Sequence, residues 1–132
     1  IVATRHSMVT YRSILCADAD ITKIQWLKKR FGSEKSIVIK LADASDMRWI
    51  KDNSVDKIVT DPPWGNFDRS IKVEELYPRV MRELSRVLKD NGVLIVLTAR
   101  QLWEKVNIDF DKRWDVLISG RQASIYKMGK KK

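Results

Sequence analysis

The sequence has little of what builds metal centres, disulfides or membrane spans. It contains one cysteine, Cys16, and one histidine, His6, among 132 residues. A lone cysteine cannot form an intramolecular disulfide, which is typical of a reducing compartment, and one cysteine with one histidine does not make a zinc-ligand set. No apolar run approaches the roughly 20 residues of a transmembrane helix. We therefore expect a cytoplasmic protein with no bound metal and no membrane contact.

Glycine is also scarce. The five glycines are isolated from one another and none precedes Asp18, so the sequence lacks a glycine-rich turn of the kind that cradles phosphate groups. The composition, with 44% hydrophobic and 33% charged residues, is typical of one soluble globular domain. The formal net charge of +9 favours a polyanionic partner, with nucleic acid first.

Apolar runs of strand length alternate with segments of helical periodicity. The predicted strands cover residues 13–17, 36–41, 56–60, 93–97, 113–119 and 122–128, and the predicted helices cover residues 21–31, 73–88 and 101–107. Residues 1–12 resemble a helix weakly, and residues 45–50 fit a short helix or a turn. Asp20 is the expected N-cap of the first helix, with Gly32 as its C-terminal stop, and Asn91-Gly92 is the expected stop of the second.

This order of elements predicts an α/β fold. Strands alternate with helices up to residue 107, and the last two strands meet at Ser119-Gly120-Arg121. We therefore expect a doubly wound, mostly parallel sheet with an antiparallel C-terminal hairpin. Because the strands are continuously apolar, we expect the sheet to be buried on both faces.

The segment Asp61-Pro62-Pro63-Trp64-Gly65 ends one of the predicted strands abruptly. Two consecutive prolines cannot continue a strand ladder, because neither has an N–H group to donate and both restrict φ. The result is a stiff corner that presents the Asp61 carboxylate, the Pro62 carbonyl and the Trp64 ring. Such a set suits a planar heterocycle, held by its amino group and stacked on its ring. By itself the segment also fits a rigid turn.

Acidic residues follow three successive predicted strands: Asp18, Asp43 and Asp61. In open α/β sheets, ligands bind beyond the carboxyl ends of the strands, so we expect these carboxylates to line one crevice. Asp18 would accept from both hydroxyls of a ribose, and Asp43 from an adenine amino group. Taken singly, Asp18 or Asp20 could be a helix N-cap and Asp43 a turn residue.

This pattern resembles the Rossmann-type S-adenosylmethionine-dependent methyltransferases that modify exocyclic amines and carry an (Asp/Asn)-Pro-Pro-aromatic signature. A narrower resemblance, to the catalytic domain of THUMP-associated RNA guanine-N2 methyltransferases, covers nearly the whole chain. The segments that carry it are Glu75-Leu76-Tyr77-Pro78, Arg82-Glu83-Leu84-Ser85-Arg86-Val87-Leu88, Gly92-Val93-Leu94-Ile95-Val96-Leu97-Thr98 and Ser119-Gly120-Arg121-Gln122-Ala123-Ser124-Ile125-Tyr126.

The resemblance implies methyl transfer from S-adenosylmethionine to an exocyclic amine of an RNA base, with guanine N2 in tRNA first. Adenine-N6 methylation of DNA or RNA is an alternative, because that chemistry favours the double proline. A third possibility is a non-catalytic methyltransferase half that binds RNA or a partner.

The resemblance also assigns roles to individual residues. The implied catalytic residues are Asp61, Pro62, Pro63 and Trp64. The implied cofactor-binding residues are Asp18, Ala19, Asp43, Ala44 and Asp61. The implied substrate-binding residues are Trp64, Gly65, Asn66 and Arg69. The cations Arg69, Lys72, Arg100 and Arg121 are expected on loops near the same rim, as phosphate contacts or simply as solvated charges. The other tryptophans, Trp26, Trp49, Trp103 and Trp114, are expected to be packing residues rather than stacking platforms.

The chain departs from the family in the missing glycine-rich turn. The family's strand order is 3-2-1-4-5-7-6, and the first, central strand and its turn have no counterpart here. We therefore expect a sheet split between the Asp18 strand and the Asp61 strand, with residues 1–11 as the first helix. Our hypothesis is that residues 1–132 are part of a catalytic domain, with the missing strand and an RNA-binding domain elsewhere in the same or another chain.

Overall fold

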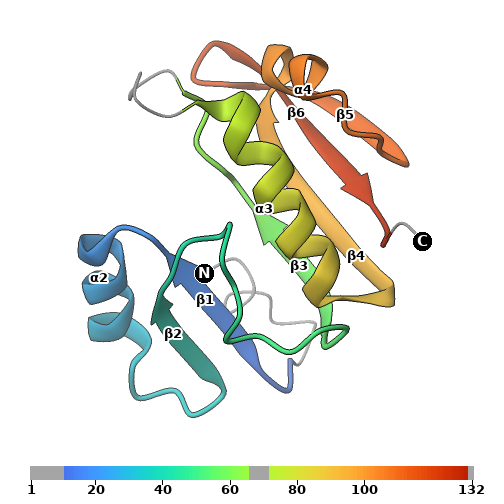
Figure 1. Cartoon of the computed structure of the whole chain (residues 1–132). Helices are drawn as coiled ribbons and strands as arrows, with labels where there is room; N and C mark the ends of the chain where they lie inside the picture. Colours follow the sequence, from blue (N-terminus) through green and yellow to red (C-terminus); the bar gives the residue numbers. More distant parts are fainter. Residues whose placement is uncertain (1–10, 66–71, 131–132) are drawn as a thin grey trace. The chain divides into compact units, whose positions relative to one another are not determined.

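The computed structural model describes residues 11–65 and 72–130, which belong to two compact units, Ile1–Ala44 and Ser45–Lys132 (Figure 1). The expected first helix therefore lies almost wholly outside the described residues, and so do Asn66 and Arg69. The described strands form two separate sheets, divided between the Asp18 strand and the Asp61 strand as predicted.

The first unit contains a parallel strand pair joined by a helix. Its elements are β1 (Ile14–Asp18), α2 (Ile21–Phe31) and β2 (Ile37–Leu41). β1 and β2 pair in register from Ile14 opposite Ile37 to Asp18 opposite Leu41. Asp20 caps α2 as predicted, because its carboxylate accepts from the Thr22 N–H at 2.8 Å and from the Thr22 hydroxyl at 2.6 Å.

The second unit is a four-stranded sheet with helices. Its elements are β3 (Val55–Thr60), α3 (Val73–Val87), β4 (Leu88–Ala99), α4 (Arg100–Val106), β5 (Lys112–Ile118) and β6 (Arg121–Met128). The strand order is β3-β4-β6-β5, in which β3 and β4 are parallel and the other two pairs are antiparallel. The predicted α/β fold with an antiparallel C-terminal hairpin is therefore confirmed. Residues 45–50 form turns rather than a helix.

The hairpin between β5 and β6 closes in a two-residue turn. Ser119 and Gly120 both have positive φ, at 49° and 76°. Two consecutive left-handed residues between paired strands are characteristic of a type I′ turn, which matches the right-handed twist of a hairpin. Glycine at the second position adopts this conformation without steric cost.

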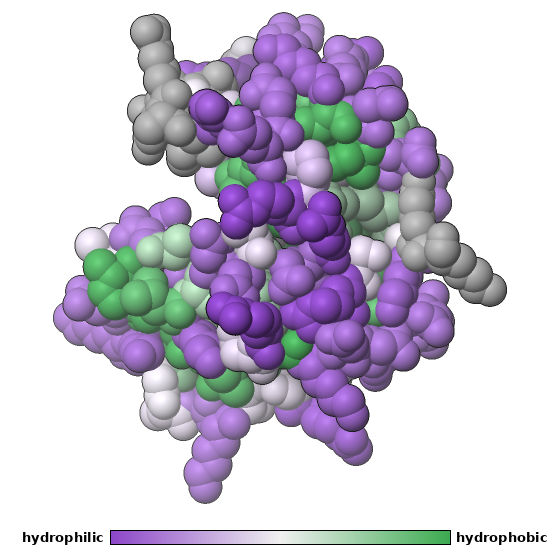
Figure 2. Space-filling view, in the orientation of Figure 1, coloured by the Kyte–Doolittle hydropathy of each residue, from purple (hydrophilic) through white to green (hydrophobic). Residues whose placement is uncertain are grey.

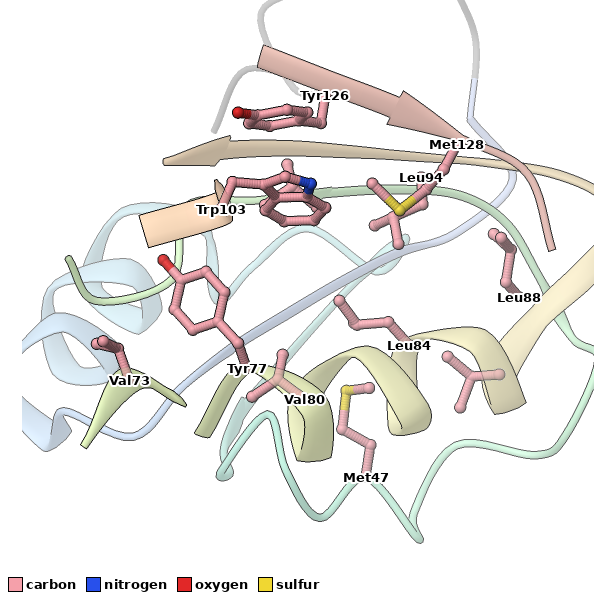
Figure 3. Close-up of a cluster of buried hydrophobic side chains, with 12 residues drawn as sticks. Met47, Val73, Tyr77, Val80, Leu84, Leu88, Leu94, Trp103, Tyr126 and Met128 are labelled. Carbon is pink, nitrogen blue, oxygen red and sulfur yellow. The ribbon is translucent and has the colours of Figure 1, made fainter. Parts of the chain in front are cut away.

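The core of the second unit lies between the helices and one face of the sheet. α3 contributes Tyr77, Val80, Leu84 and Val87, α4 contributes Trp103, and the strands contribute Leu94, Val96, Tyr126 and Met128. Figure 3 shows the Trp103 ring between the rings of Tyr77 and Tyr126. Trp103 stacks on Tyr126 with ring centroids 4.3 Å apart and meets Tyr77 edge-on at 6.4 Å. This arrangement anchors α4 to both α3 and β6.

Burial on both faces of the sheet is not what the described residues show. Along β4, buried residues alternate with half-buried ones, and Val59 on β3 is 74% exposed. The reason is that α3 and α4 pack on the same face, the one that carries Leu94, Val96 and Thr98. The prediction of continuous two-sided burial was therefore wrong for these strands.

The end of α3 also differs from the prediction. Leu88 has an extended backbone, with ψ at 137°, and it begins β4 opposite Val55. Asn91 and Gly92 therefore lie within β4 and do not end a helix. A Cβ atom on Gly92 would lie 2.6 Å from the Leu88 side chain, so glycine is needed here for close packing.

The tryptophans divide between core and surface. Trp103 is buried and Trp49 is half-buried, but Trp26 is 51% exposed and Trp114 is 40% exposed. The prediction of packing is therefore wrong for Trp26 and Trp114, whose rings instead lie near Arg30 and Lys112. On the face seen in Figure 2, hydrophilic side chains cover most of the surface, which agrees with the high content of charged residues.

Candidate active site

The corner Asp61-Pro62-Pro63-Trp64 lies at the carboxyl end of β3. The β3–β4 ladder ends where Thr60 pairs with Val96, because the prolines that follow have no N–H group to continue it. Pro62 is buried, Asp61 is exposed and Trp64 is half-buried. Gly65 follows with φ at 72°, a conformation that glycine adopts freely. The corner thus anchors one proline in the fold and presents the acid at the surface.

Trp64 and Asp61 interact directly. The indole N–H of Trp64 donates to the Asp61 carboxylate at 2.8 Å. This bond places the edge of the ring beside the acid, an arrangement that the sequence did not predict. A carboxylate offers about four acceptor positions, so it can still accept from a ligand. The pair therefore presents an aromatic ring and an acceptor together.

A buried tyrosine supports the corner from α3. The Tyr77 hydroxyl donates to the Pro63 carbonyl at 3.2 Å and lies 2.5 Å from the Thr98 hydroxyl. Tyr77 is 1% exposed and Thr98 is 0% exposed. Burial raises the pKa of Tyr77 to about 12, and the hydrogen bond with Thr98 opposes this rise. The phenol is therefore neutral, and a hydrogen-bond donor, at physiological pH.

A hollow of about 280 Å³ opens beside Trp64. Its lining residues come from the corner, the β4–α4 junction and the start of β6: Trp64, Ala99, Gln101, Arg121 and Gln122. The volume is close to the lower end of the range for small-molecule sites. An indole ring, two carboxamides and a guanidinium group can together meet a heterocycle and a phosphate.

Sequence reasoning identified Trp64 and Arg121 but missed the other residues that line this hollow. Ala99 pairs with Ala123 across the antiparallel β4–β6 ladder, which brings the end of β4 close to the start of β6. Because this proximity depends on strand pairing, no local sequence pattern predicts that Gln101 and Gln122 line a hollow. The available signals were their position next to predicted strand ends and, for Gln122, its place in a segment that resembles the family.

Two of the basic residues expected near the rim have acidic partners. The Arg100 guanidinium lies 3.3 Å from the Glu104 carboxylate and 3.6 Å from that of Asp115. The Lys72 ammonium lies 3.1 Å from the Glu75 carboxylate. These contacts favour a structural interpretation for both cations. Arg121 lines the hollow and is a candidate for a phosphate contact because of that position.

The first unit carries the two acids expected to bind a nucleoside. Asp20, not Asp18, is the N-cap of α2. The Asp18 carboxylate instead accepts from the Asp20 N–H at 2.9 Å and lies 3.5 Å from the Lys23 ammonium. The Ala42 N–H donates to the Asp18 carbonyl at 3.1 Å, so Asp43 follows directly beyond the end of the β1–β2 pair.

These residues fit the nucleoside part of S-adenosylmethionine. Asp18 ends β1 and Asp43 follows the adjacent parallel strand β2, each with an alanine next in the chain, Ala19 and Ala44. Carboxylates accept from ribose hydroxyls and from an amino group. Asp61 belongs to the other unit. That all three acids line one crevice therefore stays a prediction.

Within residues 11–65 and 72–130, no group of three or more histidine, cysteine, aspartate or glutamate side chains is arranged to hold a metal ion. In the same part of the chain, no helix has the length and apolar character that crossing a membrane requires.

A βαβ unit with acidic strand ends and a sheet with an antiparallel hairpin define the class of the fold: Rossmann-like α/β. The particular family follows from the sequence. Residues 2–112 match the family model described as "RMKL-like, methyltransferase domain", and the chain belongs to that family. No match was found among curated proteins.

Solved structures share the fold at low sequence identity. TrmN from Thermus thermophilus matches with a TM-score of 0.76 and 20% identity, over 89% of this chain and 36% of that chain. A "possible methylase" from Clostridium difficile 630 matches with a TM-score of 0.72 and 17% identity, over 91% and 32%. SMU.472, complexed with S-adenosylhomocysteine (SAH), matches with a TM-score of 0.69 and 17% identity, over 90% and 32%.

The chain thus spans about a third of the length of each of these structures. The prediction of S-adenosylmethionine as methyl donor is confirmed by two findings: the chain belongs to a methyltransferase family, and the similar structure SMU.472 holds SAH, the demethylated form of the donor.

Proposed function

We propose that this chain carries the amine-binding part of an S-adenosylmethionine-dependent RNA methyltransferase of the (Asp/Asn)-Pro-Pro-aromatic group, which modifies an exocyclic amine of a base, with guanine N2 in tRNA as first choice. The observation that carries the proposal is the corner at the end of β3, where Asp61 and Trp64 lie hydrogen-bonded side by side. Membership of a methyltransferase family supports the reaction class, and the net charge of +9 supports a nucleic-acid substrate.

An exocyclic amine is a weak nucleophile, because its lone pair is delocalised into the ring. The Asp61 carboxylate and the Pro62 carbonyl both accept hydrogen bonds, and together they would draw the amine out of conjugation. S-adenosylmethionine, when bound, supplies an electrophilic methyl group on a sulfonium. The contribution of the protein is then positioning and electrostatic stabilisation, with no covalent enzyme intermediate.

Trp64 and the adjoining hollow would receive the target nucleotide. A base that has left its helix or loop can stack on Trp64, a contact worth about 1–3 kcal/mol. Arg121 would meet a phosphate, while the carboxamides of Gln101 and Gln122 would contact polar edges of the base. Gly65, Asn66 and Arg69 lie within the five residues after Trp64 and complete the proposed substrate-binding segment.

The methyl donor would be held chiefly by the first unit. Asp18 and Ala19 would bind the ribose, Asp43 and Ala44 would bind the adenine, and Asp61 would bound the site at its methyl end. Because the chain covers about a third of its structural relatives, we propose that a further strand and an RNA-binding domain complete the site, in the same or another chain. Calorimetric titration of this chain alone with S-adenosylmethionine tests that point: tight binding would contradict it.

The deciding experiment compares Asp61→Ala with Asp61→Asn in the complete protein. Tritiated methyl transfer to tRNA is followed by nucleoside analysis. Asp61→Ala is expected to abolish transfer with little loss of RNA binding, because the acceptor for the amine is gone but the stacking ring and the basic residues remain. Asp61→Asn keeps a side-chain oxygen that can accept hydrogen bonds from the target amine and from the Trp64 N–H, so it is expected to retain measurable turnover.

Each other result selects a different function. N6-methyladenosine as the sole product would replace guanine N2 with adenine N6 as the target. RNA binding with no transfer by the unaltered protein would identify a non-catalytic methyltransferase half. Full turnover in Asp61→Ala would contradict the assigned mechanism.

A further inference from the structure

Tyr77 is a buried titratable residue that the chemistry above does not use. Its ring packs edge-on against Trp103 in the core of the second unit, as Figure 3 shows. Its hydroxyl meets the Pro63 carbonyl at 3.2 Å and the Thr98 hydroxyl at 2.5 Å. One phenol oxygen therefore joins helix α3, strand β4 and the corner.

The direction of these hydrogen bonds follows from proton counting. A tyrosine hydroxyl has one proton, and the Pro63 carbonyl can only accept, so Tyr77 donates to Pro63. Thr98 must then donate to Tyr77. The result is a chain of two hydrogen bonds that starts at a fully buried threonine and ends at the backbone of the corner.

The corner depends on such an external contact. Pro62 and Pro63 have no N–H groups, and the β3–β4 ladder stops at Thr60. Among the described residues, the corner has two hydrogen bonds, one from Trp64 to Asp61 and one from Tyr77 to Pro63. The first bond lies within the corner and fixes only the position of the Trp64 ring relative to the Asp61 carboxylate. The second joins the corner to α3 and adds to the anchoring by buried Pro62.

We propose that Tyr77 and Thr98 are positioning residues, which hold the Pro63 carbonyl and thereby set the orientation of Asp61 and Trp64 toward the target amine. The peptide group of Pro63 leads directly into Trp64, so a rotation of that carbonyl would move the ring and its acid together. A misplacement of about 1 Å at a reacting centre can cost about a hundredfold in rate. The proposal rests on the methyltransferase function proposed above.

The test compares four single variants and one double variant of the complete protein. Tyr77→Phe and Thr98→Val each break the chain of hydrogen bonds, whereas Thr98→Ser keeps it. Tyr126→Phe is the matched control: Tyr126 belongs to the same buried cluster, is also 1% exposed, and its hydroxyl has no hydrogen-bond partner among the described residues.

We expect Tyr77→Phe and Thr98→Val to lower kcat by about tenfold to a hundredfold, with little change in the KM for RNA or in the Kd for S-adenosylmethionine. The double variant should be no worse than either single variant, because both break one chain. Thr98→Ser and Tyr126→Phe should keep the kcat of the parent. Equal losses in Tyr126→Phe would mean a general effect on the core and would overturn the proposal.

A second readout does not depend on activity. With 5-fluorotryptophan incorporated, the ¹⁹F resonance of Trp64 is assigned from its loss in Trp64→Phe. The Trp64 resonance should shift or broaden in Tyr77→Phe and Thr98→Val but not in Thr98→Ser, while that of exposed Trp26 should remain fixed. An unchanged Trp64 resonance in folded Tyr77→Phe would overturn the proposal whatever the activity. Absence of methyl transfer in the parent would instead overturn the proposed function, and the resonance would still decide the role of Tyr77.

Discussion

Removal of the Arg86 side chain should destabilise the second unit strongly. Arg86 donates from α3 to the Glu83 carboxylate through two nitrogens, at 3.0 and 2.8 Å. It also donates to the carbonyls of Met47 at 2.9 Å and Ile50 at 3.0 Å, and pairs with Asp52. Its side chain is 26% exposed and that of Glu83 is 17% exposed, so water screens the pair only in part. The network attaches residues 47–52, which lead into β3, to α3.

The size of the effect follows from these contacts. Arg86→Leu leaves two main-chain carbonyls without their charged donor and leaves the Glu83 carboxylate without its cation. Loss of one partner of a fully buried pair costs about 3–5 kcal/mol, and partial exposure reduces this to about 2–3 kcal/mol. For a domain of this size that corresponds to a fall in Tm of about 6–12 °C. Thermal unfolding followed by circular dichroism measures it.

Arg48→Leu is the matched control. Arg48 also forms an ion pair, with Asp46, but the two side chains are 87% and 47% exposed. Exposed ion pairs contribute little to stability because water screens them, so this variant should unfold close to the parent. If Arg86→Leu and Arg48→Leu unfolded at the same temperature, the reasoning from burial and hydrogen bonding would be refuted.

The effect should also depend on pH. The hydrogen bond from Arg86, and after it the one from the Met47 N–H, lowers the pKa of Glu83 below its ordinary value of 4.5. Since the folded pKa is the lower one, the stabilisation is present above about pH 4.5 and is lost as the pH falls through the folded pKa. The difference in unfolding free energy between parent and Arg86→Leu should therefore narrow on acidification. A constant difference down to pH 3 would contradict the assignment to Glu83.

Two further variants test the corner and the hairpin. Trp64→Phe keeps a stacking face but removes the N–H bond to Asp61, so it should lower kcat more than it lowers RNA affinity. Trp64→Ala also removes the stacking face, so it should in addition weaken RNA binding by about 1–3 kcal/mol in a filter-binding assay. Equal RNA affinity of the two variants would exclude stacking on Trp64. Ser119→Asn places an Asn-Gly pair in the type I′ turn and should raise the unfolding free energy by about 0.5–1 kcal/mol in urea titration, and a loss of stability would contradict the assigned turn.

Local signals in the sequence were sufficient for much of the fold. The helix over residues 21–31 was predicted with its observed bounds, because an N-cap and a C-terminal glycine are local features. The hairpin and its turn could also be predicted, because two apolar runs joined by Ser119-Gly120 are likewise a local feature. The corner followed from two prolines, whose missing N–H groups end a ladder in any context.

Other features depended on contacts between distant segments. The end of α3 was misplaced because Leu88 leaves the helix to pair with Val55, 33 residues earlier in the chain. The exposure of Trp26 and Trp114 could not be seen in composition, which favours burial of large aromatic side chains. In each case packing between segments overrode a local preference.

The candidate site likewise combines residues that the sequence identifies with contacts that only the structure shows. Asp18, Asp43, Asp61 and Trp64 could be named from the sequence, because strand ends and the proline corner are encoded in neighbouring residues. The bond between Trp64 and Asp61, the hollow lined by Gln101 and Gln122, and the support of Pro63 by Tyr77 required the folded chain. The bond between Trp64 and Asp61 is local, but the hollow and the support of Pro63 join residues up to about sixty positions apart, which the pairing of β4 with β6 and the packing of α3 on the sheet bring together.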